Sequence, residues 1–293
     1  MDEGQVQQIR RFNRLITRRV GALETDYLRR GRPLAEARLI FEIGADGVDL
    51  RTLRTRLGLD SGYLSRLLQS LKAQGLITVE SGGGDGRRRR ASLTRKGNTE
   101  RAAYDGLSDR LAASMLEALD EAERFRLTAA MSEVERLIRA ASVEVGAEAA
   151  DSAEARRCLD AYFRELAARF ENGFDAGSDE SARAGDMAPP SGLFVVARLD
   201  GDPVGCGGLK RMDKTTGEIK RVWTAPSARG LGVARRVIRT LEAAARSMGL
   251  RKLRLDTNRA LTEAHALYRK EGFAEIARFN DNPYADHWFE KRL

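Results

Sequence analysis

Cysteine and histidine are scarce in this sequence, and their scarcity limits the kinds of site it can form. The 293 residues include two cysteines, Cys158 and Cys206, far apart in the chain and in no spacing typical of a metal site. So few thiols argue against a disulfide framework and favour a reducing, cytoplasmic compartment. The two histidines, His265 and His287, are too few for a histidine-based zinc site, so we expect no metal.

Long apolar runs are also missing. No stretch approaches the roughly 20 apolar residues that cross a bilayer. The first residues, 1–5, lack the basic start and apolar core of a signal peptide. With 42% hydrophobic and 32% charged residues, the composition is that of a globular chain. A chain of this length allows two domains of roughly 150 residues each.

Basic residues are in excess and unevenly distributed. The chain has 51 Lys and Arg against 43 Asp and Glu, a net charge of +8. Residues 1–141 hold 26 basic and 20 acidic residues, net +6, and residues 142–293 hold 25 and 23, net +2. Of those first 26 basic residues, 24 are arginines, whose planar donors suit phosphates and guanine edges. A general bias toward arginine codons would give the same composition, so the positions of the arginines decide between the two explanations.

The N-terminal half has the helix spacing of a helix-turn-helix module. Apolar residues recur every three or four positions, and Pro33 interrupts the pattern. Asp60 or Ser61 is a good N-cap, and Gly75 is a natural residue to end a helix. The helices expected from these signals cover residues 5–29, 34–44, 49–57 and 61–74.

The helix at 61–74 has two different faces. Its leucines share the face that must meet a core, whereas the opposite face carries Ser61, Ser65, Arg66 and Gln69. A helix-turn-helix reads the major groove with the N-terminal part of its second helix, and these side chains suit that role. An ordinary solvated face would have a similar composition.

A basic hairpin follows this helix. Residues 76–80 and 87–93 are expected as strands, joined by a glycine-rich turn at 81–86. The returning strand begins with Arg87, Arg88, Arg89 and Arg90. Their mutual repulsion is a cost that binding to a polyanion would offset. Because side chains alternate along a strand, two of the four can point toward DNA while the others lie along its backbone.

A series of short motifs runs through this region: Ser61, Ser65-Arg66-Leu67-Leu68, Gly75-Leu76-Ile77, Asp85-x-Arg87 and Leu93-Thr94-x-x-Gly97. Together they resemble the MarR family of winged-helix regulators, and the resemblance covers residues 5–141. The resemblance implies a homodimer that binds double-stranded operator DNA, with the helix at 61–74 in the major groove. It places Arg87 in the minor groove and makes Asp85 the acid that orients it. Two long helices, expected at 97–118 and 121–141, would pack with the first helix against a second subunit.

The C-terminal half alternates strands and helices. A strand expected at 143–145 follows the preceding helix directly, so we place the domain boundary between residues 141 and 142. The other expected elements are a helix at 152–172, a long loop at 173–191, a hairpin of strands 193–199 and 203–209, and strands at 218–224 and 252–256.

A segment between a strand and a helix has the features of a phosphate-binding loop. It consists of Arg229, Gly230, Leu231, Gly232, Val233 and Ala234, and it opens a helix that continues to about Met248. Glycines let backbone amides approach a pyrophosphate, and the helix N-terminus adds a partial positive charge. A dinucleotide-binding fingerprint fits less well, because Arg235 occupies its third glycine position.

The R-G-x-G-x-A pattern of this loop resembles the signature of the GNAT superfamily of N-acetyltransferases, and Asn258 and the segment 267–273 match later elements of that family. The resemblance covers about residues 142–293 and implies acetyl-CoA as cofactor. It implies that the backbone of Val222 and Thr224 holds the pantetheine arm and that the amides of 229–234 hold the pyrophosphate. Asn258 would contact the cofactor arm, and Tyr268 would lie near the thioester sulfur.

The implied reaction is the attack of an amine on a thioester, which needs a group to accept a proton and a group to donate one. Tyr268 is the family's candidate acid, although a tyrosine in a helix can also be a core residue. Glu218, early in the strand before the loop, is our candidate base, acting through water, although an exposed strand carboxylate would have the same sequence. Main-chain carbonyls at the strand splay are a further alternative. The acceptor pocket is expected from the loop at 173–191 and the tail at 279–284.

The predicted fold is thus a mainly α winged helix-turn-helix domain over residues 1–141, followed by an α/β mixed-sheet acetyltransferase domain over residues 142–293. The leading hypothesis is a DNA-binding regulator fused to an enzyme that acetylates a small amine. A second hypothesis is a repressor whose acetyltransferase fold only senses acetyl-CoA or a metabolite. A third is an enzyme whose winged helix serves only dimerisation.

Overall fold

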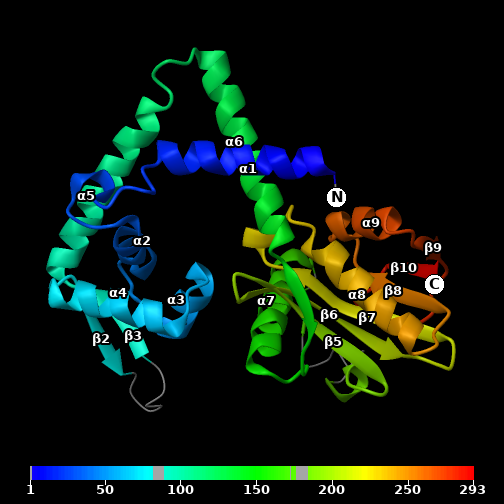
Figure 1. The fold of residues 1–293 in the computed structure, drawn as a ribbon. Helices are drawn as coiled ribbons and strands as arrows, with labels where there is room; N and C mark the ends of the chain where they lie inside the picture. The colour runs from blue at the N-terminus through cyan, green and yellow to red at the C-terminus, as the bar shows by residue number, and fades with distance from the viewer. Residues whose placement is uncertain (1, 82–88, 172, 176–183) are drawn as a thin grey trace. The chain divides into compact units, whose positions relative to one another are not determined.

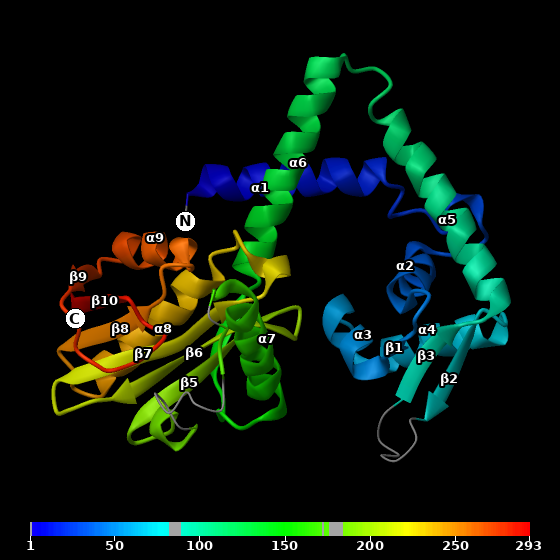
Figure 2. The same cartoon turned by 180° about the vertical axis from the view of Figure 1, so that it is seen from behind.

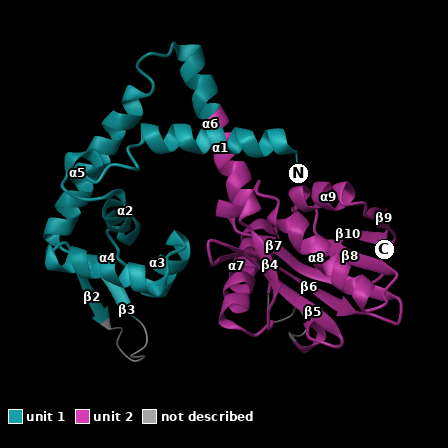
Figure 3. Ribbon diagram, viewed as in Figure 1, with its two compact units in different colours: residues 1–129 teal, residues 130–293 magenta. Residues whose placement is uncertain are grey.

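The structure, a computed structural model, describes residues 2–81, 89–171, 173–175 and 184–293. The chain divides into two compact units, Met1–Ala129 and Ala130–Leu293 (Figure 3). This division falls within one helix, α6 (Glu121–Ala141), whose last residue is where we placed the domain boundary from the sequence. Within the described residues, no helix has both the length and the apolar content needed to cross a membrane.

The first unit is mainly helical and contains a small antiparallel sheet (Figure 1). Its strands lie in the order β1-β3-β2. Its elements up to the start of α6 are α1 (Glu3–Arg19), a 3-10 turn (Tyr27–Arg29), α2 (Leu34–Ile43), β1 (Val48–Asp49), α3 (Leu50–Leu57), α4 (Ser61–Ala73), β2 (Ile77–Ser81), β3 (Arg89–Leu93) and α5 (Arg95–Ser114). This arrangement confirms the winged helix-turn-helix expected from the sequence.

Capping residues fix the two helices of the helix-turn-helix. The Asp49 carboxylate accepts from the Arg51 amide at 2.8 Å and begins α3, and Asp60 accepts from the Tyr63 amide at 2.8 Å and begins α4. Between them, Gly58 adopts the left-handed conformation with φ of 60°. The leucines of α4 are buried as predicted, which leaves the opposite face of this helix toward solvent.

The first helix is shorter than predicted. The sequence suggested one helix over 5–29, but α1 ends at Arg19 and Gly21 turns the chain with φ of 67°. The apolar spacing continued past this point because Leu23 fits the helical period, yet Leu23 is 83% exposed. The left-handed backbone at Gly21, which favours glycine, therefore outweighs the periodicity.

The second unit is a seven-stranded mixed sheet covered by helices on both faces (Figures 1 and 2). Its strand order is β4-β5-β6-β7-β8-β10-β9. After the end of α6, its elements are β4 (Glu144–Ala147), α7 (Ala153–Arg169), a 3-10 turn (Ala184–Met187), β5 (Gly192–Leu199), β6 (Asp202–Arg211), β7 (Thr216–Thr224), a 3-10 turn (Pro226–Ala228), α8 (Val233–Ser247), β8 (Lys252–Thr257), α9 (Thr262–Lys270), β9 (Ala274–Ile276) and β10 (His287–Arg292). The predicted α/β mixed-sheet fold is confirmed.

Alternation along the central strands places core residues on both faces of this sheet. On β5, Val195 and Ala197 belong to the cluster packed with α8, whereas Phe194 and Val196 belong to the cluster packed with α7. All four side chains are fully buried. The sheet therefore forms a rigid layer between α7 and α8, and the site is built where this layer opens.

The opening lies between β7 and β8, the one parallel pair in the described part of the sheet. These strands pair only through Thr216, Gly217 and Glu218, opposite residues 252–254. Further along β7, the register with β6 shifts and Arg221 adopts φ of 59°, which marks a β-bulge. Beyond it, Val222–Thr224 has no partner on β8, so the two strands diverge toward their carboxyl ends.

Candidate functional site

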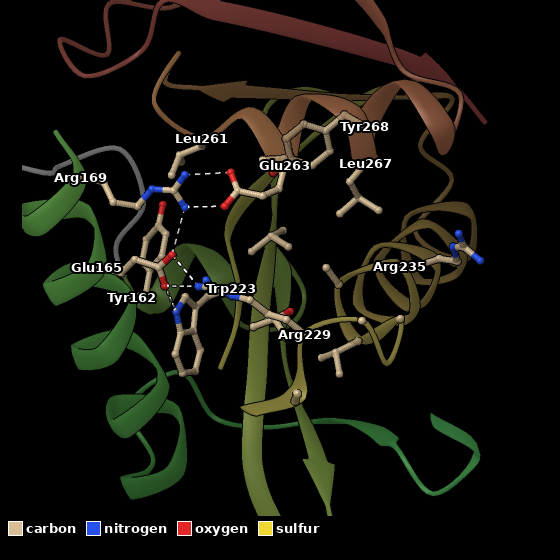
Figure 4. Close-up of a pocket in the computed structure, with 18 of the residues that line it drawn as sticks. Tyr162, Glu165, Arg169, Trp223, Arg229, Arg235, Leu261, Glu263, Leu267 and Tyr268 are labelled. Carbon is tan, nitrogen blue, oxygen red and sulfur yellow. Dashed lines mark hydrogen bonds and ion pairs between the residues drawn. The ribbon is translucent and has the colours of Figure 1, made fainter. Parts of the chain in front are cut away.

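A cavity of about 500 Å³ lies at the end of the diverging strands (Figure 4). Its walls come from the end of β7, the loop before α8, and the cavity-facing sides of α7 and α9. Most residues that we expected to hold a cofactor line it, namely Val222, Thr224, Arg229, Gly230, Gly232, Val233 and Ala234. Leu231 does not, because its side chain is buried in the core with α8. Asn258 does not line this cavity either.

The loop before α8 owes its shape to two glycines. Gly230 and Gly232 have φ of 79° and 74°, in the left-handed region, and Gly232 is the N-cap of α8. A Cβ at either position would meet no atom within 4 Å in this structure, so glycine is required here for its backbone conformation rather than for space. With no side-chain cap on α8, the first amides of the helix remain available to an anion.

Arg229 is bound to a carboxylate that the sequence analysis did not identify. Its guanidinium donates to both oxygens of Glu165 at 2.6 and 2.7 Å, and the Trp223 indole donates to the same carboxylate at 3.0 Å. Arg169 connects Glu165, at 3.3 Å, with Glu263, at 2.8 Å. Figure 4 shows these side chains along one wall of the cavity. The Arg169 hydrogen bond lowers the pKa of Glu263 to about 2, so this wall carries charge at neutral pH.

A second, smaller cavity of about 80 Å³ adjoins the first. The two share Val222 from β7, Tyr162 and Leu166 from α7, and Leu261, Ala264 and Tyr268 from α9 and the loop before it. Residues that line only the second cavity include Phe170, Phe174, Lys220, Asp256, Asn282 and Tyr284. Part of the loop expected to build an acceptor pocket, 176–183, lies outside the described residues, but Phe174 and the tail residue Tyr284 do line this space.

Tyr268 lies where the two cavities meet. It is on α9, is 7% exposed, and packs against the rings of Phe273 and Phe289 at 6.0 and 5.9 Å. Burial, and then the nearby charge of Asp256, raise the pKa of its phenol above the ordinary value of 10.0. The hydroxyl therefore stays protonated at neutral pH, the form in which it could donate a proton.

Asn258 and Glu218 are placed differently from our expectation. Asn258 lines the second cavity, where its amide donates to the Tyr284 carbonyl at 2.8 Å and accepts from the Ala260 amide at 2.9 Å. Both ends of this side chain thus hold the surrounding chain. Glu218 is 3% exposed and lines neither cavity. Buried between strands, it is the ion-pair partner of Lys220 rather than an exposed carboxylate or a base open to a substrate.

Lys220 joins Glu218 to a carboxylate that does face the second cavity. Its ammonium lies 3.0 Å from Glu218 and 2.9 Å from Asp256. Burial would lower the pKa of Lys220, but attraction to Asp256 and then Glu218 outweighs this and raises it. Asp256 also accepts from the Asn280 amide at 2.6 Å and the Asn282 amide at 3.3 Å. Asp256 was not among the predicted site residues, although its position at the end of a predicted strand was a usable signal.

In the first unit, the predicted DNA-reading residues flank a groove of about 420 Å³. Ser61, Ser65, Gln69 and Arg89 line it, together with Arg51, Arg54 and Lys72, which we did not predict. Arg66 is not among them, and its guanidinium lies 5.6 Å from the centre of the Tyr63 ring. Arg90 donates to the carbonyls of Asp46 and Gly47, so it ties β3 to the turn before β1 rather than extending freely. Asp85, Arg87 and Arg88 lie outside the described residues.

Comparison with known families matches both halves. The model described as "Acetyltransferase (GNAT) family" matches residues 159–273, and the model described as "MarR family" matches residues 30–88.

Two relatives of this chain are acetyltransferases by name. An IAA acetyltransferase from Azospirillum brasilense is 36% identical over 127 residues, which cover 43% of this chain and 77% of that protein. The uncharacterized N-acetyltransferase YsnE from Bacillus subtilis is 35% identical and covers 32% of this chain and 74% of that protein. Among solved structures, an acetyltransferase of the GNAT family from Staphylococcus aureus aligns with a TM-score of 0.45 and 17% identity, covering 52% of this chain and 99% of that one.

Proposed function

Because the chain belongs to the GNAT family of acetyltransferases and contains a MarR-family segment, we propose that it is a DNA-binding regulator fused to an enzyme that acetylates a small-molecule amine. The observation that carries the enzymatic part is the cavity that runs from the uncapped N-terminus of α8 to Tyr268. One end of this cavity suits phosphate and the other suits an acyl group.

The residues of the larger cavity fit acetyl-CoA. The amides at the start of α8, with Arg229 beside them, would hold the pyrophosphate. The backbone of Val222–Thr224, which has no partner on its β8 side, would hold the pantetheine arm, as an added strand does. The Thr224 hydroxyl is buried without a hydrogen-bond partner among the described residues, so it is available to a polar group of the ligand.

The acetyl donor supplies a carbonyl carbon activated as a thioester. The amine nitrogen would attack that carbon, the carbon–sulfur bond would break, and the Tyr268 phenol would donate its proton to the departing sulfur. Asp256 takes the place of Glu218 in this proposal, because Asp256 lines the acceptor cavity and its charge acts on Tyr268. Its carboxylate would orient the amine and accept the proton that nitrogen loses as the carbon–nitrogen bond forms. That proton would then pass to the Tyr268 phenolate, which restores both groups and leaves the amide and the free thiol of coenzyme A as products.

The regulatory part rests on the groove in the first unit. Ser61, Ser65 and Gln69 on α4 would face base edges, while Arg51, Arg54 and Arg89 would face phosphates. The exposed apolar faces of α1 and α6 support a homodimer, which would give the two recognition helices that a palindromic operator requires.

The test is release of coenzyme A from acetyl-CoA with a panel of amines, in the full-length protein and in Tyr268→Phe. We expect the wild-type protein to turn over, and the variant to lose about 10²–10⁴-fold in kcat because it lacks the proton donor. Acetyl-CoA affinity, measured by calorimetry, should stay within about twofold. Absence of turnover in the wild-type protein, together with tight acetyl-CoA binding and acetyl-CoA-dependent DNA affinity, would favour a sensor instead.

A further inference from the structure

Aromatic side chains gather on one wall of the second cavity. Tyr162 and Phe170 come from α7 and its end, Phe174 from the short segment after it, and Tyr284 from the loop before β10. The rings of Phe174 and Tyr284 lie 4.7 Å apart, and Phe170 lies 5.9 Å from Phe174 and 6.2 Å from Tyr284. Because these rings contact one another, they form a continuous apolar wall rather than a cage around a central cation.

The opposite end of this cavity is polar but has little spare negative charge. Asp256 is the one carboxylate among the described residues that line it. That carboxylate already accepts hydrogen bonds from Lys220, Asn280 and Asn282. Lys220 and Arg221 line the same space, and Glu218 pairs with Lys220 from outside it, so cations and carboxylates are balanced there. The lining can therefore orient one amino group, but its described residues include no second carboxylate for another positive charge on the same molecule.

We propose that the acetyl acceptor is a compact aromatic monoamine, a single aryl ring joined to a primary amine by a short alkyl chain. This proposal rests on the proposed function and assigns its substrate class. The ring packs against Phe174 and Tyr284, and the amine lies between Asp256 and Tyr268. Linear polyamines are disfavoured because they lack a ring for the wall and carry a second charge.

The size of the cavity limits the aryl group. Its volume is about 80 Å³, whereas a cavity of roughly 150 Å³ holds benzene. The cavity is therefore too small for an aryl ring as it stands, and a single ring enters only when Phe174 or Tyr284 rotates aside. Both residues lie outside helices and strands, where such a rotation disturbs no regular element.

The experiment measures kcat/KM for coenzyme A release with three amines: phenethylamine, its saturated analogue 2-cyclohexylethylamine, and putrescine. We expect phenethylamine to exceed the saturated analogue by about two- to tenfold, the contribution of aromatic packing beyond burial. Putrescine should be slower than phenethylamine by at least about tenfold, since it has no ring for the aromatic wall and its second ammonium finds no further carboxylate among the described lining residues.

Phe174→Leu tests the wall directly, with Phe279→Leu as its matched control. Phe174→Leu keeps apolar volume but removes a ring, so the preference for phenethylamine over its saturated analogue should fall toward one. Phe279 lies in the same loop as Tyr284 but lines neither cavity, so its replacement should leave the preference unchanged. Melting temperatures of both variants check that the fold is retained.

The outcomes separate this proposal from the proposed function. Turnover of putrescine that equals or exceeds that of phenethylamine overturns the aromatic class while leaving the acetyltransferase proposal intact. Absence of turnover with every amine overturns the acetyltransferase proposal. In that case, calorimetric binding of phenethylamine to the coenzyme A-loaded protein, lost in Phe174→Leu, still supports the aromatic site, and absence of such binding overturns it.

Discussion

At the scale of single residues, the proposed site depends on which carboxylate faces the acceptor cavity. Glu218 and Asp256 are equally buried around the same ammonium, with side chains 4% and 6% exposed. Only Asp256 lines a cavity, because β8 ends there whereas Glu218 sits where β7 and β8 still pair. Two chemically similar groups on one lysine thus have different access to a substrate.

This difference in access predicts that Asp256→Asn and Glu218→Gln lower the activity by different amounts. Each variant removes one of the two charges on Lys220, so their costs to stability should be similar. Asp256→Asn should lower kcat/KM for the amine by about 10²-fold or more, because it removes the charge that orients the amine. Glu218→Gln should lower it much less. Steady-state kinetics measure the activity of both variants, and thermal melts measure their stability. Equal losses of activity would mean that Glu218 also takes part in the reaction.

The protonation of Tyr268 also belongs to this scale. Its pKa is raised above 10.0 in the folded protein, so the phenol keeps its proton throughout the neutral and mildly alkaline range. We therefore expect that deprotonation of Tyr268 does not limit the rate of the proposed reaction below about pH 10.

At the scale of elements, α7 contributes to the acetyl-CoA site as well as to the core. Its apolar face buries Ala155, Cys158 and Leu159 against the sheet. From the side that faces the cavity, Glu165 reaches Arg229 on the loop before α8. The Glu165 carboxylate thus already binds the Arg229 guanidinium that we assign to the pyrophosphate. An incoming phosphate must therefore compete with Glu165 for Arg229.

We therefore predict that Glu165→Gln tightens acetyl-CoA binding by about three- to tenfold, because it removes an anion that competes for Arg229 and repels the phosphates. The matched control is Asp160→Asn, which makes the same charge change on the same helix at an exposed position. Isothermal titration with acetyl-CoA at two salt concentrations measures both. Weaker binding in Glu165→Gln would mean that Glu165 positions Arg229 for the ligand.

At the scale of the whole molecule, two helices present apolar side chains that neither unit buries. No residue of α1 or α6 is buried, and exposed residues include Ile9 at 62% and Phe125 at 73%. Exposed apolar stripes along two helices of this length are typical of a subunit interface. Since α6 belongs partly to each compact unit, pairing along it would involve both.

We predict that Ile9→Glu shifts the protein from dimer to monomer, because a carboxylate would have to be buried in the interface. The dissociation constant of the dimer should rise by at least about tenfold, and the affinity for operator DNA should fall in parallel. Gln7→Glu, on the opposite face of α1, makes the same change in charge and should leave the dimer intact. Sedimentation equilibrium distinguishes the two variants, and a monomeric wild-type protein would overturn the assignment.

The sequence by itself determined the features that depend on local backbone and side-chain chemistry. The caps at Asp60 and Gly75, the leucine face of α4 and the glycines before α8 act within a few residues, so their effect is visible in the order of residues. The same applies to the two fold classes, because helix and strand periodicity reports which faces must be buried. The length of α1 was the main local error.

Only the tertiary structure decided which distant side chains meet. Lys220 reaches Asp256 across 36 positions and Arg229 reaches Glu165 across 64, through strand divergence and helix packing that no local pattern encodes. Cys158 and Cys206, separated in sequence, are both buried in one core cluster for the same reason. The sequence could place a phosphate loop and a tyrosine in one domain. The packing of the sheet against α7 and α9 determined which charges stand beside them, because those contacts depend on register and layer rather than on spacing.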